Sequence, residues 1–538
     1  MVQKIYNSKH FVLYCFIASI IVLLMSSYMA IGPDSYFYIN AYDHFLKYPG
    51  SNMYQIQYFL TFALGDLMGI STIWQARLWG FAFIMLIWIV VYIGLKHDLD
   101  KKLLAIGLLL STMGLYGAPM ELGYNHFTVL FITIGFLLLY KSLSKSWLVV
   151  ISGIFFGVAV YFRFPNIVFL VLCLVPIAYH FINKEYPILK TISSGLQYLL
   201  GFTIGLVLMY LIMNRYGYWD IFIAEIKNAL LNAGNNSDTN HGSANLIKQL
   251  LKTYLVPLGI SAIYYGAFYL LKKKRIKFCN VAKKAAMVVT ILIFFAISRS
   301  AAMLYWMIGT PVLLYILFNS KYDHHLRYLA LLAGIMMYLS PLGTQSIMSF
   351  YAPFLFWIAL PVALETSSAI IRDHKDWHAF FRYSYIAIFL AVLLKNITFV
   401  TFSLYKGDYR WNSKFTVKDK KMEGIYVSKE KADAANTLKQ KFGECIPNNI
   451  PLICRDCNSP FYLNTLPYGV STGWIPLTQE DFMLDWAYKE QNQLPWILGD
   501  KDLAEKVKKH FKGITDFKLV KRYKSTLLYR PVTVYKNE

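Results

Sequence analysis

Charged residues are scarce in this chain of 538 residues. Only 15% of the residues are Asp, Glu, Lys or Arg, whereas 57% are hydrophobic and 17% are aromatic. A soluble domain carries about 25% charged residues, so this composition excludes an ordinary soluble enzyme and predicts a membrane protein. Within residues 1–403, 30 basic residues accompany only 14 acidic ones. A basic excess in so apolar a chain indicates cytoplasmic loops between membrane spans rather than nucleic-acid binding.

Cysteine is also scarce, which argues against a disulfide-rich scaffold. Among the six cysteines, Cys454 and Cys457 have CxxC spacing, but no second CxxC or His pair completes a zinc site. We predict either a local disulfide within the trio that includes Cys445, or free thiols. The chain also lacks a P-loop, a GxGxxG in strand–turn–helix context, a GxSxG and an HExxH motif, so none of the chemistries that these motifs support is indicated.

Long apolar stretches in residues 1–403 predict transmembrane helices. Residues 11–31 are apolar over about the 20 residues needed to cross the hydrocarbon core, which is longer than the apolar part of a signal peptide, so we expect an uncleaved first helix. With the later stretches the total is about thirteen spans, although a short pair such as 285–298 and 303–318 is also compatible with broken helices. The later stretches lie near residues 73–95, 103–117, 126–140, 147–162, 166–183, 191–213, 250–271, 285–298, 303–318, 327–340, 350–365 and 383–403.

Basic residues gather in alternate loops between these stretches. The basic loops are 96–102, 141–146, 184–190, 272–284, 319–326 and 366–382. The intervening loops hold most of the carboxylates and few lysines. The positive-inside rule therefore predicts an inner N-terminus, and an odd number of spans places the end of the chain outside.

Residues 404–538 have a different character, with 23 Lys or Arg against 16 Asp or Glu. Polar and apolar residues alternate, turns occur at sequences such as Pro447-Asn448-Asn449, and short runs from Thr526 and Val532 are β-like. We predict a mainly α fold: a polytopic transmembrane bundle over residues 1–403, followed by a small mixed α/β extracytoplasmic domain over 404–538.

Because acids are few, the carboxylates available for chemistry at the outer surface form a short set. The seven in outward segments are Asp34, Asp43, Asp66, Glu121, Asp220, Glu225 and Asp238. Asp34 follows the first span in Gly32-Pro33-Asp34-Ser35, at the membrane boundary, where an acid is costly unless it is paired or functional. It is either a catalytic group or the N-cap of a short interfacial helix over residues 35–47, and the two roles are compatible.

The second outer loop supplies another acid beside polar side chains. Carboxylates from two outer loops that meet over one pocket suit the activation of a hydroxyl group, so we expect Glu121 to assist Asp34. The alternative is an exposed loop acid. The side chains expected in the sugar or acceptor pocket are Tyr38, Tyr124, Asn125 and His126.

Three arginines lie in or beside apolar sequence at outer helix ends, where the positive-inside rule disfavours them: Arg77, Arg163 and Arg299. The planar guanidinium donates two hydrogen bonds at once to a phosphate, so these residues predict an anion site. The alternative for each is an internal ion pair or a snorkelling side chain. No cofactor is indicated, and no carboxylate cluster supports a divalent metal.

The end of the first span carries a recognisable set of features. These are the uncleaved span, Gly32-Pro33-Asp34-Ser35-x-x-Tyr38 after it, a long outer loop with a short helix, the segment 64–71 (LGDLMGIS), and Ala76-Arg77 leading into the second span. Together they resemble the GT-C superfamily of polyprenyl-phosphate-sugar-dependent glycosyltransferases, in the branch of protein mannosyltransferases and lipid A aminoarabinose transferases. The motifs cover about 70 residues, and the expected topology covers the whole chain.

This resemblance implies roles for individual residues. Asp34 matches the acid that acts as catalytic base or orients the acceptor. Many members follow it with a second acid, whereas this chain has Ser35, so Glu121 is the candidate for the paired role by analogy. Arg77, Arg163 or Arg299 corresponds to the basic residues that hold the lipid phosphate. Some GT-C oligosaccharyltransferases require a divalent metal, which nothing in this sequence supports.

The resemblance also implies an activity and a location. We expect a multi-pass enzyme of the cell or inner membrane that transfers a sugar from a polyprenyl phosphate to a hydroxyl of a lipid, glycan or protein. Its partners are the lipid-linked sugar, the acceptor and membrane lipids, with no nucleic acid. The alternatives are a transporter or flippase of lipid-linked sugars, and a surface-glycan ligase or polymerase. A transporter predicts broken helices related by an internal repeat, which the sequence lacks.

Overall fold

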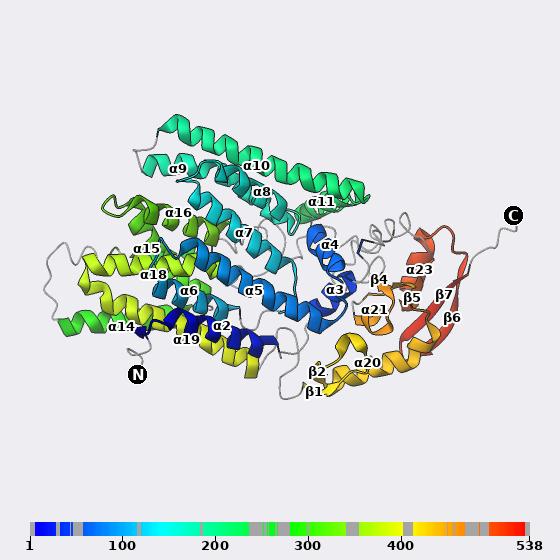
Figure 1. Ribbon diagram of the computed structural model, residues 1–538. Coiled ribbons are helices and arrows are strands. Elements are labelled where there is room, and N and C mark those ends of the chain that lie inside the picture. The colour runs from blue at the N-terminus through cyan, green and yellow to red at the C-terminus, as the bar shows by residue number, and fades with distance from the viewer. Residues whose placement is uncertain are drawn as a thin grey trace.

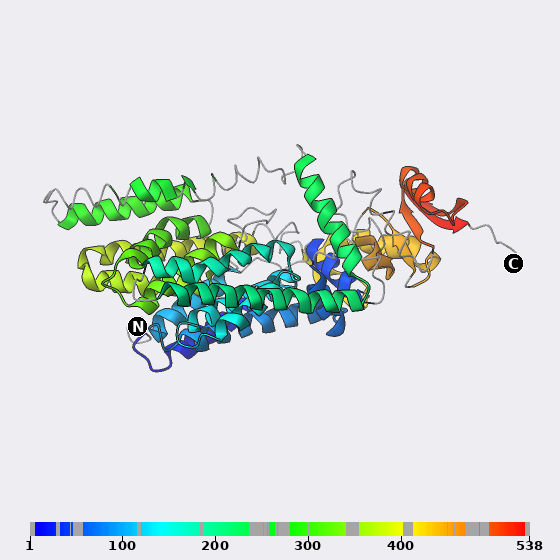
Figure 2. The same cartoon turned by 90° about the horizontal axis from the view of Figure 1, so that it is seen from above.

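The computed structural model is an elongated helical bundle with a smaller α/β unit at one end (Figure 1). Figure 2 shows the same arrangement from above. The structure describes residues 6–27, 33–42, 45–46, 58–115, 120–182, 187–235, 251, 255–256, 258–263, 266, 280–298, 301–340, 355–401, 413–448, 450–455, 458–467, 484 and 494–532.

Most of the bundle's helices overlap the predicted apolar stretches, but residues 59–67 and 219–235, in predicted outer loops, are helical as well. The bundle's helices are α2 (Phe11–Ser27), α3 (Pro33–Tyr42), α4 (Phe59–Leu67), α5 (Ile73–Leu95), α6 (Lys101–Gly114), α7 (Tyr124–Lys141), α8 (Leu148–Ala159), the 3₁₀ helix η2 (Phe164–Leu174), α9 (Val175–Ile182), α10 (Ile188–Arg215), α11 (Trp219–Asn235), α14 (Asn280–Ile297), α15 (Ala301–Phe318), α16 (His324–Leu339), α18 (Phe356–Asp373), the short 3₁₀ helix η5 (Lys375–Trp377) and α19 (His378–Thr401). The predicted stretch 250–271 lies largely outside the described residues.

Five helical segments in the described part are long and apolar enough to cross a bilayer: Ile73–Leu95, Tyr124–Lys141, Phe164–Phe181, Ile188–Arg215 and Lys375–Leu394. The prediction of a mainly helical membrane protein is confirmed, whereas the number of spans stays a prediction. Helix α5 illustrates how local sequence sets a boundary. The Thr72 hydroxyl accepts a hydrogen bond from the Gln75 N–H at 3.2 Å, and the Gln75 side chain accepts one from the Thr72 N–H at 3.1 Å. This capping box starts the helix just before its apolar run.

Helices α8 and α10 lie side by side in both views (Figure 1; Figure 2) and pack backbone to backbone. Gly153 and Gly157 on α8 face Gly201 and Gly205 on α10. A Cβ atom on Gly201 would overlap the carbonyl oxygen of Val150. This is the small-xxx-small arrangement that lets membrane helices approach closely.

We expect Gly201→Ala to destabilise the protein by about 1–3 kcal/mol, because its methyl group has no room against α8. Gly334→Ala on α16 is the matched control, since a Cβ there meets no described atom within 4 Å. It should be neutral or slightly stabilising because alanine favours helix. Unfolding of the purified protein in detergent measures both, and equal midpoints for the two variants would contradict the close packing of α8 and α10.

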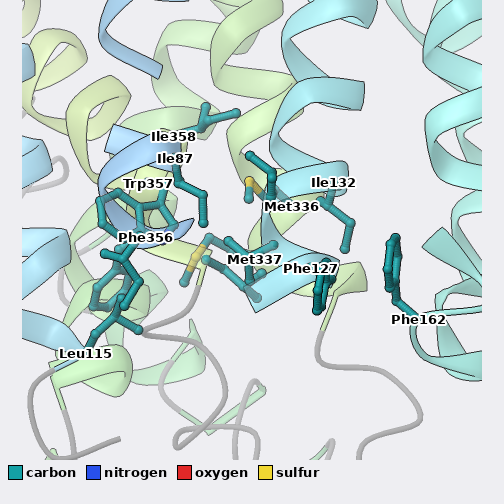
Figure 3. Packing of buried hydrophobic residues seen from close by; sticks show 14 of the residues in the cluster. Ile87, Leu115, Phe127, Ile132, Phe162, Met336, Met337, Phe356, Trp357 and Ile358 are labelled. Carbon is teal, nitrogen blue, oxygen red and sulfur yellow. The ribbon is translucent and has the colours of Figure 1, made fainter. Parts of the chain in front are cut away.

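A large apolar core lies between the helices along the bundle. We call the end of the bundle that carries α3 and α4 the α3 end. Figure 3 shows side chains of this core from the ends of several helices. Phe127 near the start of α7 stacks on Phe162 after α8, with ring centroids 5.1 Å apart. The figure also labels Met336 and Met337 of α16 and Trp357 of α18, each of which is at most 1% exposed. The polar groups described below therefore adjoin an apolar core.

The chain after the bundle forms the predicted mixed α/β structure. Its elements are β1 (Ser413–Thr416), η7 (Lys420–Met422), β2 (Tyr426–Ser428), α20 (Lys429–Phe442), η8 (Gly443–Cys445), β3 (Pro451–Ile453), α21 (Asn458–Leu463), β4 (Leu466–Pro467), β5 (Trp496–Gly499), α23 (Lys501–His510), β6 (Asp516–Tyr523) and β7 (Thr526–Val532). Strands β1 and β2 pair antiparallel, and the larger sheet has the order β4-β3-β5-β7-β6. Strand β3 is parallel to both β4 and β5, and the other pairs are antiparallel.

Three predictions for this domain fall partly or wholly outside the described residues. The β-like run from Val532 continues beyond residue 532, where the description ends. Of the cysteine trio, Cys457 lies outside the described residues, and Cys445 has a free thiol. The boundary at residue 404 stays a prediction, since residues 402–412 also lie outside them.

Candidate functional site

Helix α3 carries the first predicted site residue, Asp34. The helix begins at Pro33, so the prediction that Asp34 is an N-cap is wrong, and it ends at Tyr42 rather than at residue 47. Proline is favoured at the first helical position because its missing N–H would have had no partner there. An acid in the first turn is favoured by the helix dipole. The side chain of Asp34 lies outside the described part of the structure.

Two tyrosines on α3 pack against glycines of neighbouring segments, one in the loop before α7 and one in α4. The ring of Tyr38 lies against Gly123, where an added Cβ would be 2.6 Å from the ring, and the ring of Tyr42 fills the space where Gly65 lacks a side chain. The Tyr42 hydroxyl donates a hydrogen bond to the carbonyl of Leu122. Burial raises the pKa of the Tyr42 phenol, and the nearby Glu121 carboxylate raises it further, so Tyr42 stays a neutral donor. Helix α3 is thus held directly over the loop that contains Glu121.

Glu121 and Arg77 form a buried ion pair at the α3 end. Arg77 Nε and Nη2 each lie 2.9 Å from Glu121 Oε1, and both residues are only 3% exposed. The loop lies on α5: Leu122 N–H donates to the Ala76 carbonyl at 2.8 Å. Glu121 is therefore not an exposed loop acid, and the alternative of an internal ion pair holds for Arg77. Each charge is neutralised by the other, which limits what either offers an incoming phosphate or hydroxyl group.

The other predicted pocket residues gather beside this pair at the start of α7. His126 Nδ1 accepts a hydrogen bond from the Gly123 N–H at 3.2 Å, which caps the helix and leaves the proton of a neutral ring on Nε2. Tyr124 stacks on Tyr58 with centroids 4.5 Å apart and also contacts Tyr38. Among the described atoms, Oδ1 of Asn125 is buried and has no hydrogen-bond partner. The structure thus brings Tyr38, Tyr124 and His126 together around Gly123.

Arg163 occupies a second buried position. It is the N-cap residue of η2, is 4% exposed, and its Nη1 donates to the carbonyl of Ser340 at the end of α16, at 3.3 Å. Helix α4 contacts the preceding residues, since Leu60 N–H donates to the Tyr161 carbonyl at 3.0 Å. Arg77 and Arg163 therefore have different partners in the described structure. Arg299 lies outside the described residues.

A buried acid that the sequence did not single out is Glu225 on α11. It is 4% exposed, and Phe222 one turn earlier stacks on Tyr161 with centroids 5.5 Å apart. Ile221 and Phe222 are buried as well. The sequence feature that could have identified Glu225 is its position three residues after Phe222, on the apolar face of an amphipathic helix. In the described ranges, no group of three His, Cys, Asp or Glu side chains has the arrangement of a metal site.

The C-terminal domain docks on α3 and on the start of α5. The hydroxyls of Tyr36 and Tyr462 are hydrogen-bonded, and the Tyr36 ring meets Phe461 edge-on at 5.0 Å. Gly424 has φ +73°, and a Cβ there would lie 2.7 Å from Trp74 Nε1, so the domain's backbone approaches α5 closely. A cavity of about 610 Å³ lies between the two parts of the protein.

No protein-family model and no curated protein matches the chain. Among solved structures, it is similar to the oligosaccharyltransferase of Archaeoglobus fulgidus, solved with a tethered acceptor peptide containing the NVT sequon. The similarity has a TM-score of 0.43 and 10% sequence identity, and it covers 98% of this chain and 75% of that one.

Proposed function

We propose that this protein is an integral-membrane glycosyltransferase of the GT-C type, which transfers a sugar from a polyprenyl phosphate to a hydroxyl group on the extracytoplasmic face. One observation carries the proposal: α3 packs on the loop that holds Glu121, which forms a buried ion pair with Arg77 of α5. Position 34 precedes Tyr38 by one helical turn, about 6 Å along the axis, and Tyr38 lies against Gly123. We therefore infer that the acids of the first two outer loops, Asp34 and Glu121, act together in this region.

The chemistry requires few groups because the donor is already activated. Asp34 would take the proton from the acceptor hydroxyl, whose oxygen attacks the anomeric carbon as the bond from that carbon to the phosphate oxygen breaks. Polyprenyl phosphate leaves, and a single displacement inverts the anomeric centre. Such a reaction needs a base, cations for the departing phosphate and a dry, oriented pocket.

The remaining site residues receive supporting roles. We assign Glu121 to orienting Asp34 or the acceptor, and Arg77, Arg163 and Arg299 to the phosphate, with the charge of Arg77 shared with Glu121. Tyr38, Tyr124, Asn125 and His126 would line the sugar or acceptor pocket. The basic inner loops and the outward acids support a multi-pass topology of about thirteen spans with an inner N-terminus and an outer C-terminal domain.

The test is a transfer assay with the full chain in sealed proteoliposomes. Polyprenyl-phosphate mannose and polyprenyl-phosphate aminoarabinose, each radiolabelled, are supplied with lipid, glycan and peptide acceptors, and nucleotide sugars serve as the control donors. We expect label to appear on an acceptor, with release of polyprenyl phosphate, only from a lipid-linked donor. Movement of the intact lipid-linked sugar across the bilayer without transfer would instead identify a flippase and overturn the proposal. Repeated addition to one glycan would identify a polymerase.

A further inference from the structure

The cavity beneath the C-terminal domain is formed by residues far apart in the sequence. Ser71 and Thr72, just before α5, form one side. The rest of the lining comes from the C-terminal domain: Asp419, Lys420, Lys421, Lys439, Gly443, Glu444, Asn448, Tyr462, Leu463 and Asn464. Its volume of about 610 Å³ lies within the range of small-molecule sites, about 300–1,000 Å³.

The charges in this lining are predominantly positive. Three lysine ammonium groups accompany two carboxylates. Asp419 is committed to Lys439, with 2.7 Å between Oδ2 and Nζ, and its Oδ1 also accepts the N–H of Lys421 at 2.8 Å to cap η7. That cap positions Lys420 and Lys421, and the Lys421 ammonium lies 5.4 Å from the centre of the Phe461 ring. Lys420 is exposed, and it has no ion-pair partner in the described structure. The other charged groups of the lining are Lys420, Lys421 and Glu444.

The uncharged lining groups suit a polyhydroxylated ligand rather than a lipid chain. Side chains of Ser71, Asn448 and Asn464 provide hydrogen-bond donors and acceptors, and Tyr462 adds an aromatic ring. Leu463 is the only aliphatic residue among the lining residues described, and no residue from within an apolar span takes part. A polyprenyl tail would lack the apolar surface it needs.

The cavity adjoins the proposed catalytic region through two elements. Tyr462 lines the cavity, and its hydroxyl is bonded to Tyr36, two residues after Asp34. Thr72 lines it as well, and lies five residues before Arg77, about 7.5 Å along the axis of α5. Through Tyr462 and Thr72 the cavity is therefore connected to α3 and to the start of α5, the two helices that carry Asp34 and Arg77.

We propose that this cavity binds an acidic sugar of the acceptor, whose carboxylate or phosphate lies at Lys420 and Lys421. That the bound sugar belongs to the acceptor rests on the proposed glycosyltransferase function. That the cavity binds an acidic sugar rests on the cavity alone. Ion pairing with two ammonium groups selects the charge, and the amide, hydroxyl and phenol groups select the sugar.

The test measures binding directly, independently of transfer. The full chain in phosphatidylcholine nanodiscs is titrated by calorimetry with a glucuronate-bearing tetrasaccharide and with its neutral, carboxyl-reduced counterpart. We expect the acidic sugar to bind at least about tenfold more tightly than the neutral one. Lys420→Gln with Lys421→Gln should remove this preference, and Lys420→Gln alone should reduce it. The matched control, Lys509→Gln with Lys512→Gln, changes the same charge at exposed positions of the same domain outside the lining.

Other outcomes separate the alternatives. Equal binding by wild type and the Lys420/Lys421 double variant, or equal binding of the two sugars, would overturn the proposal. The proposal would also be overturned if these lysines affected only the attachment of the protein to bilayers, making it stronger on phosphatidylglycerol than on phosphatidylcholine. That result would identify a lipid headgroup as the ligand. An Asp34→Asn variant should keep the binding. Lysine-dependent binding by a protein with no transferase activity would leave the acidic-sugar site in place and overturn only the proposed function.

Discussion

Asp34→Asn should lower the rate of sugar transfer by about 10²–10⁴-fold, because the amide keeps the shape of the side chain and cannot accept the proton of the acceptor hydroxyl. Transfer is measured in proteoliposomes with the lipid-linked donor, under conditions that are linear in enzyme. Loss of one favourable charge near the N-terminus of α3 should cost the fold about 0.3–1 kcal/mol. Asp34→Glu keeps a carboxylate on a longer arm and should retain part of the activity.

The matched control is Asp220→Asn. Asp220 is also in the first turn of a helix at the α3 end, but it is exposed. Its replacement should leave transfer within about twofold of wild type, as expected of a surface change of less than about 0.5 kcal/mol. Near-normal transfer by a well-folded Asp34→Asn protein would remove Asp34 from the mechanism. A comparable loss in both variants would point to a general electrostatic effect.

Breaking the Arg77–Glu121 pair should be strongly destabilising. Glu121→Gln leaves the Arg77 guanidinium buried without its counter-charge, and Arg77→Met leaves the carboxylate in the same position. Each should reduce the free energy of unfolding by about 3–5 kcal/mol. The double variant, Arg77→Met with Glu121→Met, should recover a large part of that loss, because two apolar side chains remove both buried charges together. Unfolding of the four proteins in mixed detergent micelles completes the double-mutant cycle.

An exposed ion pair in the same chain calibrates this result. Lys141 is the last residue of α7, and Asp98 lies in the loop after α5. Lys141 Nζ is 2.6 Å from Asp98 Oδ2, and the two side chains are 39% and 22% exposed. Lys141→Met should therefore cost less than about 1 kcal/mol. Additive losses in the Arg77/Glu121 cycle would mean that the two side chains do not act as a pair. Loss of transfer by the double variant with its stability restored would show that the pair also serves the reaction, in keeping with the proposed roles.

Local sequence was sufficient for the individual helices. The apolar run at 73–95 matches α5 residue for residue, because length and hydropathy are properties of the segment alone and its capping box is written in Thr72 and Gln75. Helices α4 and α11 were not predicted, because they lie in segments read as outer loops. The start of α3 also differed: Pro33 serves as its first residue, so the helix starts one position ahead of Asp34 instead of being capped by it. The mixed α/β nature of the last domain was equally visible in its alternating pattern and turns, although the order of its strands was not.

The candidate site was only partly accessible from the sequence. Scarcity of acids reduced the outward candidates to seven, among which Glu121 was singled out and Glu225 was not. The sequence could not tell an exposed loop acid at 121 from a buried partner of Arg77, 44 residues away, and it gave no sign that Tyr36 meets Tyr462 across 426 residues. The lysine-lined cavity was equally hidden, because its two sides come from the start of α5 and from the domain after the bundle.

By itself, then, the sequence determined that this is an apolar, helical membrane protein with a polar α/β domain at its end, since partitioning into a bilayer depends on the composition of each segment and requires no knowledge of its neighbours. Only the tertiary structure decided that Glu121 is neutralised by Arg77, that α3 lies over the loop containing Glu121, and that Lys420 and Lys421 line a cavity. Burial and ion pairing depend on which segments pack together, and periodicity along one segment carries no information about its partners.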